Sequence, residues 1–163
     1  APLLAGGHHE FSLRAGTENV AALVGFAEAA ALGMGSLEHE AVRLAALRDR
    51  LEEQLLKAVP DIIIHGKNAP RVPNTSNISF LSVESESILL HLDLLGICAS
   101  AGSACTTGSP EQSHVLLAMG CSAPEAQGAV RFSLGKDTNE NQINTVTEAL
   151  CGIIKKLRQV SSM

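Results

Sequence analysis

Short apolar runs alternate with longer segments of helical spacing, and this alternation is the feature that most limits how the chain can fold. The runs DIIIHG, ISFLSV and AVRFSLG have the β-branched content and period of strands, and ICASA indicates a further short, buried strand. The segments between them place Leu and Ile at three- and four-residue steps, as helices do. We therefore expect an α/β domain with two layers, in which helices cover a small, mixed sheet.

The helical segments carry start and stop signals. Thr17 is expected to cap a helix over residues 18–32 that ends at Gly33 and Gly35, and Ser36 is expected to start the next helix. A helix over residues 84–95 would end at Gly96, and a long amphipathic helix would begin at Asp137 or Thr138; its apolar face comprises Ile143, Val146, Leu150, Ile153 and Leu157.

Two serines have the pattern of a capping box. Ser109 is followed by Pro110 and Gln112, and Ser122 is followed three residues later by Glu125. Each pair predicts the start of a helix.

Composition excludes several classes of protein. A chain of 163 residues can bury one core, and with aromatic residues at 2% that core must be aliphatic. A net charge of -5 without clustered Lys or Arg argues against nucleic acid and anionic membranes as partners. The most apolar stretch, residues 20–35, contains glycines and is short for a membrane span.

The cysteines at positions 98, 105, 121 and 151 match no zinc pattern, and we expect free thiols in a reducing, cytoplasmic setting. Cys98, on the predicted buried strand, and Cys151, on the last helix, are expected to pack in the interior. Cys105 differs because Gly, Ser and Thr surround it in ASAGSACTTGSPEQS. It follows a strand end and precedes a helix start, where a thiolate is favoured. This setting predicts a nucleophilic or redox thiol; the alternative is an exposed loop cysteine without a role.

Three segments together resemble a known family. SAGSACTTGSPEQSHVLLAMG, the following AVRFSLGKDTNENQI, and GGHHEFSLRAGTEN near the start resemble the cysteine desulfurases, which are pyridoxal 5'-phosphate (PLP) enzymes of the aminotransferase class V group. The resemblance covers essentially the whole chain and implies the C-terminal portion of such an enzyme. Residues 1–16 would then be a remnant of the large PLP domain and hinge. Residues 17–163 would be the small C-terminal domain of a fold-type I PLP enzyme.

The resemblance implies roles for individual residues. Cys105 would be the mobile persulfide carrier, and Arg131 would hold the substrate carboxylate. Thr17 would reach the PLP phosphate of the other subunit of a homodimer, and Arg14 would help in the same region. The alternatives are a surface arginine on an edge strand for Arg131 and an ordinary helix cap for Thr17.

The segment GGHHEFSLRAGTEN departs from the family's GGGQERGxRSGTEN at His8, Phe11 and Ser12. These changes bear on the geometry near the cofactor in the dimer. His8 and His9 predict no metal site, because adjacent side chains diverge and a third ligand is not evident. The remaining histidines are expected to be solvated or packed: His39, His65, His91 and His114.

The implied function is removal of sulfur from L-cysteine, which gives L-alanine and an enzyme persulfide for iron–sulfur cluster assembly or other sulfur transfer. The partners would be L-cysteine and an acceptor such as an iron–sulfur scaffold protein, with no nucleic acid and no membrane. The chain contains the lysines Lys57, Lys67, Lys136, Lys155 and Lys156, and none has the His-Lys context of the family's PLP lysine. The fragment alone is therefore expected to be inactive. The alternatives are a stand-alone persulfide carrier or partner-binding module, and a selenocysteine lyase.

Overall fold

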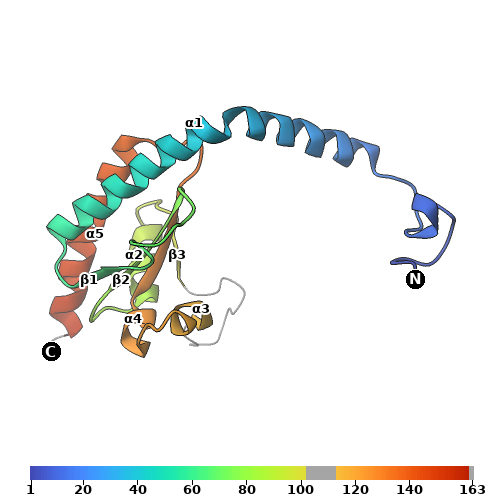
Figure 1. Cartoon of the computed structure of the whole chain (residues 1–163). Coiled ribbons are helices and arrows are strands. Elements are labelled where there is room, and N and C mark those ends of the chain that lie inside the picture. Colours follow the sequence, from blue (N-terminus) through green and yellow to red (C-terminus); the bar gives the residue numbers. More distant parts are fainter. Residues whose placement is uncertain (102–112, 162–163) are drawn as a thin grey trace. The chain divides into compact units, whose positions relative to one another are not determined.

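The computed structural model describes residues 1–101 and 113–161. The chain forms two compact units, Ala1–Glu38 and His39–Met163, which we describe separately (Figure 1). The first unit contains a 3₁₀ turn, Glu10–Ser12, and the beginning of a long helix. The boundary between the units lies inside that helix, whereas the sequence suggested a domain boundary after residue 16. That domain boundary stays a prediction about the protein as a whole.

The second unit is built on a small sheet. Its strands are β1 (Ile62–Ile64), β2 (Thr75–Phe80), β3 (Ser100–Ala101) and β4 (Ala129–Ser133), in the spatial order β1-β2-β4-β3. Each neighbouring pair is antiparallel. The α/β class is confirmed, but the expectation of a mixed sheet is wrong in the described residues. A strand pattern in the sequence gives no direction, which depends on the neighbour that the strand finds.

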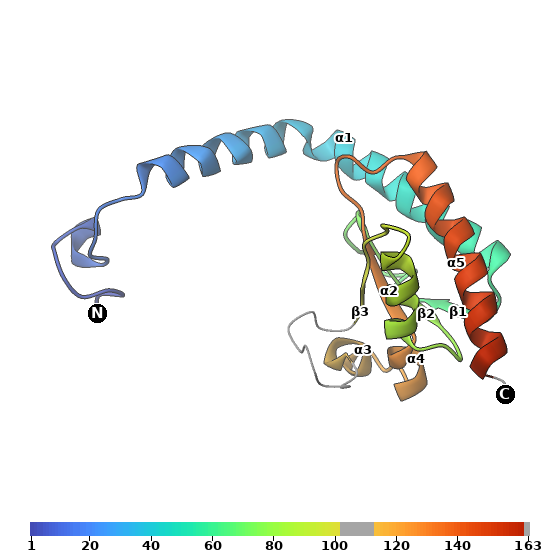
Figure 2. The same cartoon turned by 180° about the vertical axis from the view of Figure 1, so that it is seen from behind.

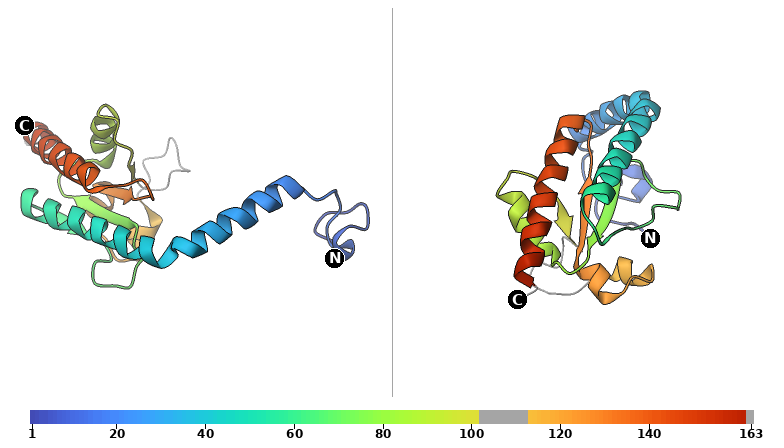
Figure 3. Two further views of the ribbon diagram at one scale, coloured as in Figure 1. Left: turned by 90° about the horizontal axis from the view of Figure 1, so that it is seen from above. Right: turned by 90° about the vertical axis from the view of Figure 1, so that its left-hand side faces the viewer.

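Helices cover one face of this sheet. They are the part of α1 (Val20–Ala58) that lies in the second unit, α2 (Ser85–Asp93) and α5 (Glu140–Ser161). Gln54 of α1 accepts a hydrogen bond of 2.9 Å from Thr147 of α5, so these two helices lie side by side, as Figures 2 and 3 also show.

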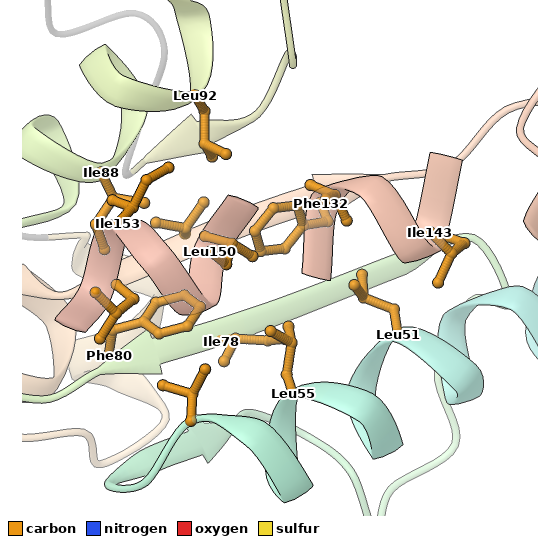
Figure 4. Close-up of a cluster of buried hydrophobic side chains, with 14 of the residues drawn as sticks. Leu51, Leu55, Ile78, Phe80, Ile88, Leu92, Phe132, Ile143, Leu150 and Ile153 are labelled. Carbon is orange, nitrogen blue, oxygen red and sulfur yellow. The ribbon is translucent and has the colours of Figure 1, made fainter. Parts of the chain in front are cut away.

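The core between the helices and the sheet is almost entirely aliphatic, as the composition requires. Leu51 and Leu55 of α1 and Leu150 of α5 pack against the sheet side chains (Figure 4). Ile78 and Phe80 of β2 are fully buried there. The expected apolar face of the last helix is confirmed by the burial of Ile143, Val146, Leu150 and Ile153, with Leu157 packed at its edge.

The helix α1 differs from the prediction. Val20–Ala58 is one continuous helix, so Gly33 and Gly35 lie inside it and Ser36 starts no new helix. A glycine inside a helix costs about 1 kcal/mol but does not end it unless the backbone turns left-handed. Here the Ser36 hydroxyl donates back to the Leu32 carbonyl, within the same helix.

Because α1 is continuous, its first part is long and apolar enough to cross a membrane, and the argument from interrupting glycines is wrong. The apolar side chains of this part are exposed within the first unit: Val20, Leu23, Val24, Phe26, Leu32, Met34 and Leu37. Core helices of soluble proteins meet the same criterion, so length and composition assign no membrane location.

Other local signals are confirmed. Ser122 and Glu125 form the capping box that starts α4 (Ala123–Gln127), and Gly96 has the positive φ, 71°, expected after a helix end. The helix α3 (His114–Ala118) begins after Ser113, whose hydroxyl accepts from the Leu116 amide. Ser109, the other predicted cap, lies outside the described residues.

One buried ion pair ties the loop before β2 to α1. The carboxylate of Glu52 is 3% exposed and binds both terminal nitrogens of Arg71, at 2.7 and 2.8 Å. It also accepts a 2.7 Å hydrogen bond from Ser76. Burial acts to raise the pKa of Glu52, but the bonds from Arg71 and Ser76 outweigh it and leave the pKa below its usual value. Loss of Arg71 would leave the buried carboxylate of Glu52 without its ion-pair partner.

Gly128 generates a prediction about stability. A Cβ atom at this position would meet the carbonyl oxygens of Phe80 and Val83, and the Gly128 carbonyl accepts from the Phe80 amide at 3.0 Å. We expect Gly128→Ala to lower the free energy of unfolding by about 2 to 3 kcal/mol, measured by urea denaturation, because the backbone must move.

Gly152→Ala is the matched control. Gly152 lies in α5, and an added Cβ would meet nothing within 4 Å. This change should raise the free energy of unfolding by about 0.5 to 1 kcal/mol. Equal effects of the two substitutions would contradict the close approach at Gly128.

Candidate functional site

The sheet face that points away from the core is polar and only partly covered. Because side chains alternate along a strand, Thr75, Asn77 and Ser79 of β2 share this face with their register partners on β4. One end of the face lies under α3 and α4, where Leu116, Ala126 and Ala129 form a small apolar cluster. At the other end the β4 side chains are exposed.

Arg131 stands on this open part. It lies on β4, which has β2 on one side and β3 on the other, so the alternative of an edge-strand arginine is wrong. Its side chain is exposed and makes no hydrogen bond or ion pair with the described part of the chain. An arginine whose Cα is held from both sides, and whose planar donor fork is free, can bind a carboxylate through two hydrogen bonds.

Asn77, which sequence reasoning missed, pairs directly with Arg131 in the strand register. Its Oδ1 atom is buried and has no hydrogen-bond partner among the described residues. An unpaired buried acceptor costs about 1 to 3 kcal/mol, so such an atom requires an explanation. A free donor group and an unpaired acceptor thus lie on neighbouring strands of one sheet face, which is suited to a polar ligand.

Residues 102–112, which contain Cys105, lie outside the described residues, but both flanking segments are described. The strand that enters this segment, β3, pairs with β4 so that Ser100 lies opposite Arg131 and Ala101 opposite Val130. The segment is therefore attached to the sheet directly beside the candidate carboxylate-binding arginine. The role of Cys105 stays a prediction.

The other cysteines have different surroundings. Cys98 is exposed and precedes β3, so the expectation that it is buried in a strand is wrong; β3 comprises only Ser100 and Ala101. Cys151 is half-buried and packs against the main core, as expected for the last helix. Cys121 is half-buried beneath α3 and α4 and has His65 as a hydrogen-bond partner.

Thr17 and Arg14 belong to the first unit. The cap of α1 is Asn19, whose Oδ1 accepts from the Ala22 amide at 3.1 Å, so the alternative of Thr17 as the cap is wrong. Thr17 is exposed, and its hydroxyl has no bond to the described residues. Arg14 donates to the carbonyl of Gly16 at 3.0 Å, and Gly16 has a φ of 104°, a conformation that favours glycine. Thr17 as a phosphate ligand stays a prediction.

The described residues fit only the phosphate end of PLP. A free hydroxyl beside the N-terminus of α1 is suited to an anion. The lysines, however, are all exposed on the second unit, and Lys57 is paired with Glu53 at 2.6 Å. A lysine that bonds the cofactor needs a neutral amine in an enclosed site, which none of these positions offers.

Comparison with known proteins shows clear relatives. The model of the family described as aminotransferase class-V matches residues 7–146. A cysteine desulfurase of Nostoc sp. is 49% identical over 160 residues, and the cysteine desulfurase NifS of Azotobacter vinelandii is 48% identical. Each match covers 98% of this chain and 40% of the relative, so the chain spans about 40% of the relatives' length.

The chain is also similar to solved structures of NifS-like proteins. The X-ray structure of a NifS-like protein from Rickettsia africae is 34% identical and superposes with a TM-score of 0.82, over 95% of this chain and 40% of that one. A second NifS-like protein is 30% identical, with a TM-score of 0.74, and covers 99% of this chain.

The positions around Thr17 generate a second prediction. Asn19→Ala should speed hydrogen exchange at the Ala22 amide, because loss of a cap costs about 1 kcal/mol at a helix start. Thr17→Ala is the matched control and should leave that exchange rate unchanged. A larger effect of Thr17→Ala would show that Thr17, and not Asn19, caps α1.

Proposed function

We propose that this chain, which belongs to the aminotransferase class-V family, supplies the C-terminal part of a cysteine desulfurase. The whole enzyme would take sulfur from L-cysteine, release L-alanine and hold the sulfur as a persulfide for an acceptor. The observation that carries this proposal is Arg131 on an interior strand, without a partner among the described residues and beside the strand that precedes the Cys105 segment. The identity of 49% to a cysteine desulfurase supports it.

Arg131 would orient the substrate. Its guanidinium can bind the carboxylate of L-cysteine with two hydrogen bonds, while the strands on either side fix the position of the arginine. The unpaired Oδ1 of Asn77, on the neighbouring strand, offers an acceptor on the same face for a guanidinium N–H of Arg131.

Cys105 would accept the sulfur. Its thiolate bonds to the substrate sulfur while the bond from that sulfur to Cβ breaks and leaves its electron pair with the carbon, which takes up a proton to become alanine. PLP, when bound, supplies the electron sink for this chemistry. The lysine that bonds PLP would come from the part of the enzyme beyond this chain. Thr17 would bind the PLP phosphate in a homodimer.

The acceptor would be a protein such as an iron–sulfur scaffold, and the enzyme would act in the cytoplasm, where thiols stay reduced. The exposed apolar side chains of the first part of α1 would be covered by the remainder of the enzyme rather than by lipid, which accords with a family match that includes this helix. A reading frame that continues upstream into a lysine-bearing half agrees with this proposal. A start codon near Ala1 would contradict it and favour the carrier module.

Arg131→Lys, made in the complete enzyme, tests the carboxylate site. Lysine keeps the charge but cannot form two parallel hydrogen bonds, so we expect kcat/KM for L-cysteine to fall about 10- to 100-fold. Thermal unfolding should stay unchanged, because Arg131 has no partner in the described residues. Lys136→Ala, three residues beyond β4, is the control and should keep full activity. Full activity of Arg131→Lys would remove the proposed role.

The persulfide can be located directly. After the complete enzyme reacts with L-cysteine, peptide mass spectrometry should find one added sulfur on Cys105, and Cys105→Ser should abolish sulfide release. Cys98→Ser is the control, since Cys98 is exposed and lacks the proposed role. An added sulfur on another cysteine, with Cys105 unmodified, would exclude the assignment. Faster turnover of L-selenocysteine than of L-cysteine would instead favour a selenocysteine lyase.

A further inference from the structure

Three side chains distant in the sequence form a hydrogen-bonded row at the covered end of the polar sheet face. His65 follows β1, Ser79 lies on β2, and Cys121 lies between α3 and α4. Cys121 Sγ is 3.4 Å from His65 Nδ1, and His65 Nε2 is 2.6 Å from Ser79 Oγ. The Ser79 hydroxyl in turn lies 2.6 Å from the carbonyl oxygen of Glu125.

The end of this row determines the direction of every bond in it. A carbonyl oxygen can only accept, so the single hydroxyl proton of Ser79 goes to Glu125. Ser79 Oγ must then accept from His65, which places the ring proton on Nε2. The Nδ1 atom of a neutral His65 consequently carries a lone pair and accepts the thiol proton of Cys121.

The ring is held in its neutral form. Burial lowers the pKa of His65 below its usual value, and the carboxylate of Glu125 on α4 only partly opposes this effect. Among the described residues, Glu125 is the charged group whose field acts on the ring. At neutral pH His65 is therefore an oriented base with its free nitrogen beside a thiol.

We propose that Cys121 is a nucleophilic thiol activated by His65 and a site of modification by small disulfides. His65 Nδ1 takes the thiol proton, and the sulfur of Cys121 bonds to one sulfur of the disulfide. The disulfide bond breaks, its electron pair leaves with the other sulfur, and that thiolate takes the proton from His65. The products are a mixed disulfide on Cys121 and one free thiol, so Cys121 is oxidised as the reagent is reduced.

The surroundings of Cys121 suit this reaction and distinguish it from its neighbours. Cys121 is half-buried and packs at the edge of the small cluster of Leu116, Ala126 and Ala129, so the residue is not enclosed in the main core. Neither Cys98 nor Cys151 has a histidine partner among the described residues. The site needs neither PLP nor Arg131, so it stands apart from the proposed desulfurase chemistry.

The test measures how fast each cysteine of the complete protein reacts with 2-hydroxyethyl disulfide, a small uncharged reagent. Acid quenching and peptide mass spectrometry report each cysteine separately. At pH 7 we expect Cys121 to react at least about tenfold faster than the more exposed Cys98. His65→Asn should remove this advantage and leave the Cys98 rate unchanged. A Cys121 rate at or below that of Cys98, or one insensitive to His65→Asn, would overturn the proposal.

The pH profile of the unaltered protein gives a second test that does not depend on how a variant folds. Cys98, which has no histidine partner among the described residues, gives the reference profile. The Cys121 rate should stay high through neutral pH and fall only below pH 6.5, once His65 is protonated and stops accepting. Glu125→Gln should move this fall to lower pH, because it removes the charge that favours the protonated ring. Parallel profiles for Cys121 and Cys98 would refute the activation.

Discussion

The burial of one sheet face beneath aliphatic side chains is the interaction on which the rest of the second unit depends. With aromatic residues at 2%, the chain fills its core with Leu, Ile and Val from α1, α2 and α5, against the inward-facing residues of β2 and β4. Because a strand alternates its side chains, burial of Ile78 and Val130 obliges their neighbours Asn77 and Arg131 to face the other way. The polar face is thus a direct consequence of the core.

This arrangement makes the polar face rigid as well as accessible. Arg131 lies on an interior strand, and its position is fixed by β2 and β3 on either side. The proposed desulfurase reaction would need a carboxylate held in one orientation while a thiol approaches, and a strand provides that positioning better than a loop. The pairing of β3 with β4 places Ser100 opposite this arginine, a few residues before Cys105 in the sequence.

The two ends of the polar face differ in exposure to solvent: Arg131 is exposed at one end, and His65 is partly buried at the other. Arg131 is exposed at the open end and has no partner among the described residues. At the other end α3 and α4 cover His65, and burial favours the neutral ring that can accept a proton from Cys121. The same sheet face therefore carries an exposed guanidinium at one end and a partly buried imidazole at the other.

Local signals in the sequence determined much of the secondary structure: the strand runs, the capping box at Ser122, the stop at Gly96 and the apolar face of the last helix. The residue pattern alone also suggested Cys105 as a reactive thiol, whereas Arg131 was suggested by the family resemblance. Such signals report what a few neighbouring residues prefer. They could not show that the strands pair antiparallel, because strand direction depends on the neighbouring strand. They also could not show that α1 continues through Gly33 and Gly35, because continuation depends on the helix as a whole.

Only the tertiary structure brought together residues that the sequence separates. Asn77 meets Arg131 through strand register, and His65 meets Ser79 and Cys121 through the packing of α3 and α4 on the sheet. No spacing rule connects positions so far apart, because the contacts between them are set by the path of the chain and not by its local conformation. The chain composition determined that one sheet face would be buried, and the packing decided which polar groups would meet on the other.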